Sequence, residues 1–231
     1  MKNCIFQYWI GEEPDWVKIS KRKFKEYADA VGAEYIYSNQ LNYCNNPYFE
    51  NLRVLYDPVF SDYDRVLYVD VDVIPENFNN IFDEEIKDIG LVPEYRPKGM
   101  NADPYFALKN VEMQYKAAAS FFKIPVKTPK TVKASYLMFN SGVILWSKEG
   151  IQKAAKRFIN WERWHHILNG NMSLDQPYIN GQVQKYLKYT ELELKWNCYP
   201  KFRFYEGQEP EKMNFVHYTG GKKKYIKEYY E

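Results

Sequence analysis

Short apolar runs alternate with a helical pattern in the first third of the chain, and this order constrains the fold most strongly. Residues 3–10, NCIFQYWI, and residues 34–38, EYIYS, have the composition of strands, and the helical spacing of apolar residues between them ends at Gly32. Residues 65–69, RVLYV, form a third run that is apolar enough to be buried on both faces. Alternation of this kind predicts a parallel sheet with helices on its faces.

The second half of the chain continues with less regular patterns. We expect strands at 88–92, 136–146 and 213–217, part of a helix at 104–119, and one continuous helix whose apolar face runs from Ile151 to His165. No internal repeat or linker divides the chain, so we expect a single domain spanning 1–231.

Composition narrows the class of protein. The 231 residues include 32 basic and 30 acidic ones, and a net charge of +2 argues against binding nucleic acid through overall charge. The three cysteines, Cys4, Cys44 and Cys198, are far apart and lack metal-site spacing, which favours a reducing compartment. No signal peptide and no apolar stretch of about 20 residues is present. We therefore expect a cytoplasmic protein without a membrane span.

An Asp-x-Asp pair follows the apolar run at 65–69. Side chains alternate along a strand, so Asp70 and Asp72 are expected to point to the same side. Two carboxylates held so close together favour a neutralising cation, and oxygen ligands suit Mg²⁺, Mn²⁺ or Ca²⁺. The simpler alternative is a pair of solvated acids that ends the strand.

A second motif lies near the end of the sequence, HYTGGKKKY at 217–225. A histidine at a strand end can bind a metal, glycines let backbone amides approach an anion, and lysines supply charge to a diphosphate. The alternative interpretation is a solvated basic run beside an ordinary histidine.

Taken together, these two motifs resemble the family 8 glycosyltransferases. That family has a strand-end Asp-x-Asp and a late His-x-x-Gly-x-x-Lys. His217, Gly220 and Lys223 fall on this spacing, although Lys-Tyr replaces the Pro-Trp that follows in the family.

Three further segments match the family in order. FNSGVILW is similar to the family's Asn-Ala-Gly strand along the donor sugar and contributes Asn140 and Ser141. DQPYIN is similar to the Asp-Gln-x-x-x-Asn segment near the reacting carbon and contributes Asp175 and Gln176. Arg53 stands where the family has a donor-contacting Arg or Lys before the metal strand.

The resemblance implies a Rossmann-like α/β fold of the A type, with a mixed, mainly parallel sheet flanked by helices. It assigns residues 1–95 to the nucleotide-sugar-binding half and residues 96–231 to the acceptor-binding half. It implies metal-dependent transfer of a hexose from a UDP-sugar to a glycan or glycoprotein acceptor, with retention of configuration. A nitrogen ligand among oxygens favours Mn²⁺, with Mg²⁺ as the alternative.

The resemblance also assigns the site residues. Tyr8 and Trp9 either stack on the uracil ring or fill the sheet. The predicted metal ligands are Asp70, Asp72 and His217; the predicted donor-binding residues are Gln7, Tyr8, Arg53, Asp70, Val71, Ser141, Gly220 and Lys223; and the predicted catalytic residues are Asn140, Asp175 and Gln176.

Two other functions share parts of this pattern. A haloacid dehalogenase-type phosphohydrolase also carries Asp-x-Asp after an apolar strand, but it needs a later acidic residue, usually a pair. After Asp103 the only aspartate in the sequence is Asp175, which disfavours that chemistry. The second alternative is a catalytically silent carbohydrate-binding domain, and the complete metal triad argues against it.

Overall fold

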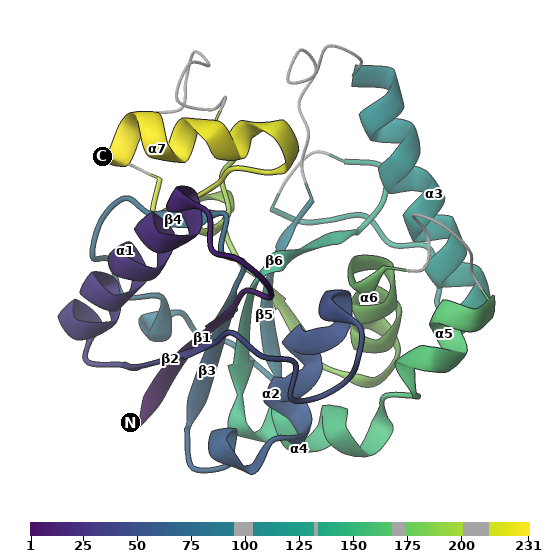
Figure 1. Cartoon of the computed structure of the whole chain (residues 1–231). Helices are drawn as coiled ribbons and strands as arrows, with labels where there is room; N and C mark the ends of the chain where they lie inside the picture. Colours follow the sequence, from purple (N-terminus) through teal and green to yellow (C-terminus); the bar gives the residue numbers. More distant parts are fainter. Residues whose placement is uncertain (95–103, 132–133, 168–173, 201–212) are drawn as a thin grey trace.

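A six-stranded sheet forms the centre of the computed structural model, which describes residues 1–94, 104–131, 134–167, 174–200 and 213–231 (Figure 1). Its strand order is β2-β1-β3-β6-β5-β7, and a separate two-stranded sheet pairs β4 with β8. The strands are β1 (Asn3–Tyr8), β2 (Glu34–Ser38), β3 (Arg65–Val69), β4 (Val73–Pro75), β5 (Ile89–Pro93), β6 (Phe139–Ser147), β7 (Tyr189–Glu191) and β8 (Phe215–His217).

One strand runs against the others in the central sheet. β1 pairs in parallel with β2 and β3, and β5 pairs in parallel with β7, whereas β6 is antiparallel to both β3 and β5. The sheet is therefore mixed and mainly parallel, as expected. Because β6 is reversed, its first residues lie at the edge where β1 and β3 end.

The alternation of side chains along the strands divides the core between the two faces of the sheet. Ile5 and Leu67 face a core that includes Phe24 of the first helix, while Phe6 and Tyr68 face the opposite core. Both faces are covered, which explains why the strands read as continuous apolar runs.

Helices cover these two faces (Figure 1). α1 (Asp15–Val31) and α7 (Lys224–Tyr230) pack together on one side through Ile19 and Ile226. The helices on the other side are α2 (Arg53–Tyr56), α3 (Pro104–Phe122), α4 (Lys148–Arg157), α5 (Trp161–Ile167) and α6 (Asp175–Tyr186). Short 3-10 helices are η1 (Pro47–Leu52), η2 (Pro58–Phe60), η3 (Ile81–Asp83), η5 (Leu194–Trp196) and η8 (Gly220–Lys223).

The first helix ends where the sequence predicts. Gly32 adopts a left-handed conformation with φ of 67°, and its N–H donates to the carbonyl of Ala28. A residue without a side chain tolerates this conformation at little cost, so glycine is the usual end of such a helix.

The single helix expected from Ile151 to His165 was wrong, because the structure has two helices there, α4 and α5. Asn160 separates them: its side-chain Oδ1 accepts a hydrogen bond of 2.8 Å from the backbone N–H of Glu162. This contact offers the backbone a helix start in place of a continued helix.

Within the described ranges, none of the helices is both long enough and apolar enough to cross a membrane. All three cysteines are free, with Cys4 and Cys198 buried.

Candidate functional site

Asp70 and Asp72 lie at the end of β3, as predicted, but alternation along a strand is not what brings them together. β3 ends at Val69, and Asp70-Val71-Asp72 forms a turn that β4 follows. The N–H of Val73 closes this turn on the carbonyl of Asp70 at 3.1 Å. The carboxylates therefore converge because the backbone reverses between the two strands.

His217 reaches the same place through the small sheet. β8 pairs with β4 so that His217 lies opposite Val73, directly after the aspartate turn. Its Nε2 is 3.1 Å from Oδ1 of Asp72 and 3.9 Å from Oδ2 of Asp70. Residues 145 positions apart in the chain thus form one cluster.

This cluster fits a divalent cation. One ligand atom from each of Asp70, Asp72 and His217 lies within 4.8 Å of the others. Two carboxylates and an imidazole are a donor set that suits Mn²⁺.

Gly142 makes the close approach of these ligands feasible. A Cβ atom there would lie 2.4 Å from Cε1 of His217 and 2.9 Å from Oδ2 of Asp70. The N–H of Asp70 also donates to the carbonyl of Gly142 at 2.9 Å, so β6 supports the turn directly. The FNSG segment contains this glycine, but its sequence pattern alone does not indicate the role.

The ionisable groups perturb one another. Desolvation and the neighbouring charge of Asp72 raise the pKa of Asp70. Burial alone would raise the pKa of Asp72, but His217 and Lys223 outweigh it and lower that pKa. Burial alone would lower the pKa of His217, but the two aspartates outweigh it and raise that pKa. Negative charge is therefore concentrated on Asp72, and protons and cations compete for the same atoms.

Lys223 joins the cluster from η8. Its Nζ is 3.1 Å from Oδ2 of Asp72 and lies 4.9 Å above the ring of Trp16. Gly220 begins this turn with φ of 60°, a conformation that favours glycine. Lys222 and Lys224 instead lie over the ring of Tyr225, so the three consecutive lysines have different surroundings.

A cavity of about 490 Å³ opens beside the cluster. Tyr8 forms part of its wall, with its ring stacked on Tyr68 and its hydroxyl donating to the carbonyl of Pro47 at 2.6 Å. The lining residues are Tyr8, Trp9, Ile10, Pro47, Tyr48, Tyr68, Asp70, Val71, Asp72, Ser141, Asp175 and Lys223.

Asp175 enters this cavity from the first turn of α6. Its Oδ2 accepts a hydrogen bond of 2.8 Å from Nδ2 of Asn51, and Ser141 also donates to the carboxylate. Burial raises the pKa of Asp175 against these stabilising contacts. Gln176 next to it accepts a bond of 3.3 Å from the N–H of Ser141. Asn51 was not predicted, and its position next to Arg53 is the only signal that the sequence offers.

Some predicted site residues have internal partners and do not line this cavity, among them Gln7, Arg53 and Asn140. Gln7 is fully buried and donates to Oγ of Ser20 at 3.2 Å. Arg53 pairs with Asp57 at 2.6 Å. Asn140 lies behind the metal cluster, where its amide donates to Oε2 of Glu94 at 2.8 Å.

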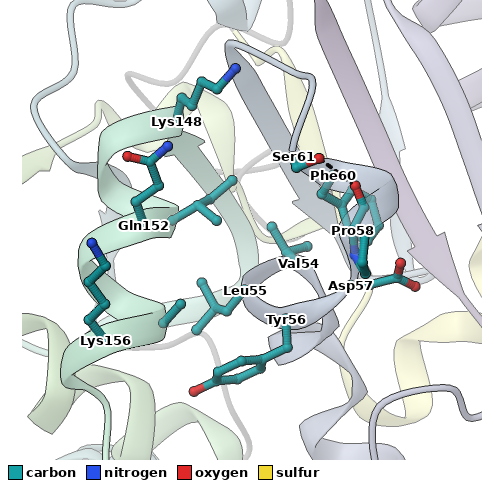
Figure 2. A pocket seen from close by; sticks show the side chains of 12 residues that line it. Val54, Leu55, Tyr56, Asp57, Pro58, Phe60, Ser61, Lys148, Gln152 and Lys156 are labelled. Atoms are coloured by element: carbon teal, nitrogen blue, oxygen red, sulfur yellow. Dashed lines mark hydrogen bonds between the residues drawn. The ribbon is translucent and has the colours of Figure 1, made fainter.

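A second cavity, of about 430 Å³, lies between α2 and α4 (Figure 2). Val54 and Leu55 contribute apolar side chains from α2, and Lys148, Gln152 and Lys156 follow one another along α4. None of the predicted site residues lines it.

The fold is that of the A-type glycosyltransferases, and comparison with solved structures supports it. The chain superposes on a glycosyltransferase involved in glycosylation of the major capsid of PBCV-1 with a TM-score of 0.56 and 13% identity, over 99% of this chain and 100% of that one. It superposes on the galactosyltransferase LgtC in complex with donor and acceptor sugar analogues with a TM-score of 0.52 and 13% identity, over 94% and 87%.

A family model described as glycosyl transferase family 8 matches residues 12–224, and the chain belongs to that family. It is therefore a glycosyltransferase, which confirms the resemblance and sets aside the phosphohydrolase. No curated protein sequence matches the chain significantly.

Proposed function

We propose that this glycosyltransferase transfers a hexose from a UDP-sugar to a glycan or glycoprotein acceptor, depends on Mn²⁺ and retains the anomeric configuration. The observation that carries the proposal is the convergence of Asp70, Asp72 and His217 beside a cavity that Lys223 also lines. Family membership supports the same chemistry.

The three ligands would hold the cation at the mouth of the cavity. When bound, a divalent cation stabilises negative charge on the diphosphate leaving group. The carboxylate of Asp72, which its neighbours keep ionised, provides the attraction, and Gly142 leaves room for the ligands to approach one another.

Lys223 would support the leaving diphosphate. It lies within 3.1 Å of Asp72, so its ammonium is next to the place where the diphosphate would approach the metal ligands. A fixed positive charge stabilises a developing negative charge without reorganisation.

The donor sugar would lie against the side chains at the start of α6. The carboxylate of Asp175 opens into the cavity, and Asn51 and Ser141 hold it in one orientation. A carboxylate there can bond sugar hydroxyls and stabilise the positive charge that develops on the sugar. Tyr8 and Trp9, which also line the cavity, would offer rings on which a uracil base can stack.

We assign donor binding mainly to residues 1–95 and acceptor binding mainly to residues 96–231. The first half supplies Tyr8, Asp70 and Asp72. The second half contributes Ser141, Asp175 and Lys223 to the lining of the same cavity.

The test is a transfer assay in which the purified protein is given UDP-hexoses, a panel of glycan acceptors and either Mn²⁺ or a chelator. The proposal expects Mn²⁺-dependent release of UDP and a product with the donor's anomeric configuration. Turnover that is unchanged by chelator would contradict metal dependence, and an inverted product would contradict retention.

A further inference from the structure

His217 has a second ring nitrogen that does not face the metal cluster. Nε2 faces the aspartates, whereas Nδ1 lies 3.0 Å from Oδ1 of Asn197. Both His217 and Asn197 are buried. Nε2 faces a carboxylate, which can only accept a hydrogen bond. Whether Nδ1 also carries a proton depends on which atom of the Asn197 amide faces the ring.

The orientation of that amide follows from its neighbours. Glu94, when ionised, can only accept hydrogen bonds, so the group of Asn140 that faces its Oε2 at 2.8 Å must be the NH₂. On its other side, Asn140 presents Oδ1 to the backbone N–H of Gly142 at 2.8 Å, which requires an acceptor. Two independent contacts therefore fix the amide of Asn140.

Asn140 in turn fixes Asn197. Because Oδ1 of Asn140 is an acceptor, the atom of Asn197 that lies 2.8 Å from it must be the NH₂. The remaining atom, Oδ1 of Asn197, then faces His217 and can only accept. The contact at 3.0 Å is satisfied only when Nδ1 of His217 carries a proton.

The backbone holds the two residues in this register. His217 donates to the carbonyl of Cys198 at 2.6 Å, and Cys198 donates to the carbonyl of Phe215 at 2.9 Å. These backbone hydrogen bonds hold the segment after η5 next to β8, so the side chain of Asn197 lies in a fixed position beside the imidazole ring of His217.

We propose that Asn197 is a positioning residue that keeps a proton on Nδ1 of His217, so that Nε2, which faces Asp72, is the nitrogen that gives up its proton when a cation binds. The same residue links His217 to Asn140, so the metal ligand and a predicted donor-sugar residue share one buried hydrogen-bond network. The metal part of this inference rests on the proposed function, whereas the position of the proton does not.

The test uses ¹⁵N-histidine NMR of the whole chain, which has only three histidines. In the wild type, Nδ1 of His217 should carry a slowly exchanging proton both without metal and with Mg²⁺. In Asn197→Leu this proton should exchange fast or be absent. Asn197→Asp should restore the proton on Nδ1, because a carboxylate accepts the same bond from His217, although it can no longer donate to Oδ1 of Asn140. The signals of His165 and His166 on α5 serve as internal references for an intact fold.

Metal affinity gives a second readout. Calorimetry should show Mn²⁺ binding weakened by about 10–100-fold in Asn197→Leu, which is typical for the loss of a partner of a metal-bound histidine. Asn197→Asp should lose less. Failure of the wild type to bind metal would reject the metal site of the proposed function and leave the NMR result to decide the proton position.

The inference is overturned if Nδ1 of His217 carries no proton in the wild type without metal. It is also overturned if Asn197→Leu keeps the wild-type Nδ1 signal and the wild-type metal affinity.

Discussion

The cavity beside Asp70 and Asp72 and the groove between α2 and α4 have similar volumes, about 490 and 430 Å³. Their linings differ. The first contains an acid cluster at the carboxyl edge of the sheet, with pKa values shifted by its own neighbours. The second has an apolar floor to which Val54 and Leu55 contribute, and lysines follow one another along its α4 side (Figure 2).

The contrast shows that the volume of a hollow does not identify a site in this protein. Packing helix α4 against α2 leaves a groove without any need for chemistry. Burying carboxylates together is unfavourable unless a cation or a substrate neutralises them, so such a cluster is a stronger sign of function.

The largest effect should come from Asp72→Ala. Asp72 is in contact with both His217 and Lys223, so its loss removes a metal ligand and leaves both cationic groups without their main partner. We expect Mn²⁺-dependent UDP binding to be abolished, measured by calorimetry. Lys156→Ala, in the groove, is the matched control. If it lost as much UDP binding as Asp72→Ala, the two cavities would not differ in function as we infer.

The next effect should come from Asp175→Asn. The change keeps the shape but removes the charge that faces the cavity, so turnover should fall by ~10²-fold, the scale for loss of one electrostatic stabiliser. UDP affinity should change little, because the proposal places the diphosphate at the metal ligands and Lys223 instead. Steady-state kinetics measures turnover and the donor KM separately. A change confined to the donor KM, with turnover unaltered, would refute the role assigned to Asp175.

A smaller effect is expected from Lys223→Ala. Loss of one charged hydrogen bond should weaken UDP binding by about tenfold or more. Lys222→Ala and Lys224→Ala are the controls, because both lie over Tyr225 and away from Asp72. Similar losses at all three positions would indicate a diffuse basic surface.

The dependence on pH should separate the acid cluster from ordinary surface acids. The pKa values of Asp70 and His217 are both raised. Protons therefore compete with the metal for these two residues at a higher pH than they would for an isolated aspartate or histidine. Mn²⁺ affinity should fall by about tenfold per pH unit for each displaced proton as the pH decreases. Calorimetry at a series of pH values around neutrality checks this. An Mn²⁺ affinity that stays unchanged as the pH falls to the usual carboxylate pKa would contradict it.

The smallest effect is expected in the groove. Ile151→Ala in α4 removes apolar contacts with α2, so thermal unfolding should occur at a lower temperature. Turnover and UDP binding below that temperature should stay at the wild-type level. A selective loss of turnover with unchanged stability would give the groove a functional role.

The sequence predicts well those features that depend on local patterns. The apolar run at 65–69 and the alternation before it account for β3 and the parallel part of the sheet. The two motifs around Asp70 and His217 predict a metal cluster, because their residue types suit one even though 147 positions separate the two residues.

Other features depend on contacts that no local pattern records. The turn at Val71 and the pairing of β4 with β8 are tertiary events, and only they explain how the ligands meet. Asn197 lies in KWNCYP, which has no recognisable spacing, and it contacts His217 only because η5 is fastened to β8. Arg53 has a family-like position in the sequence, yet its nearest partner is Asp57.

The most direct test of the central claim is anomalous diffraction from a crystal of the chain grown with Mn²⁺ and UDP. The account predicts one manganese peak bound by Asp70, Asp72 and His217, with the diphosphate between the metal and Lys223. A manganese ion that lies away from these three residues while UDP occupies the cavity would contradict it.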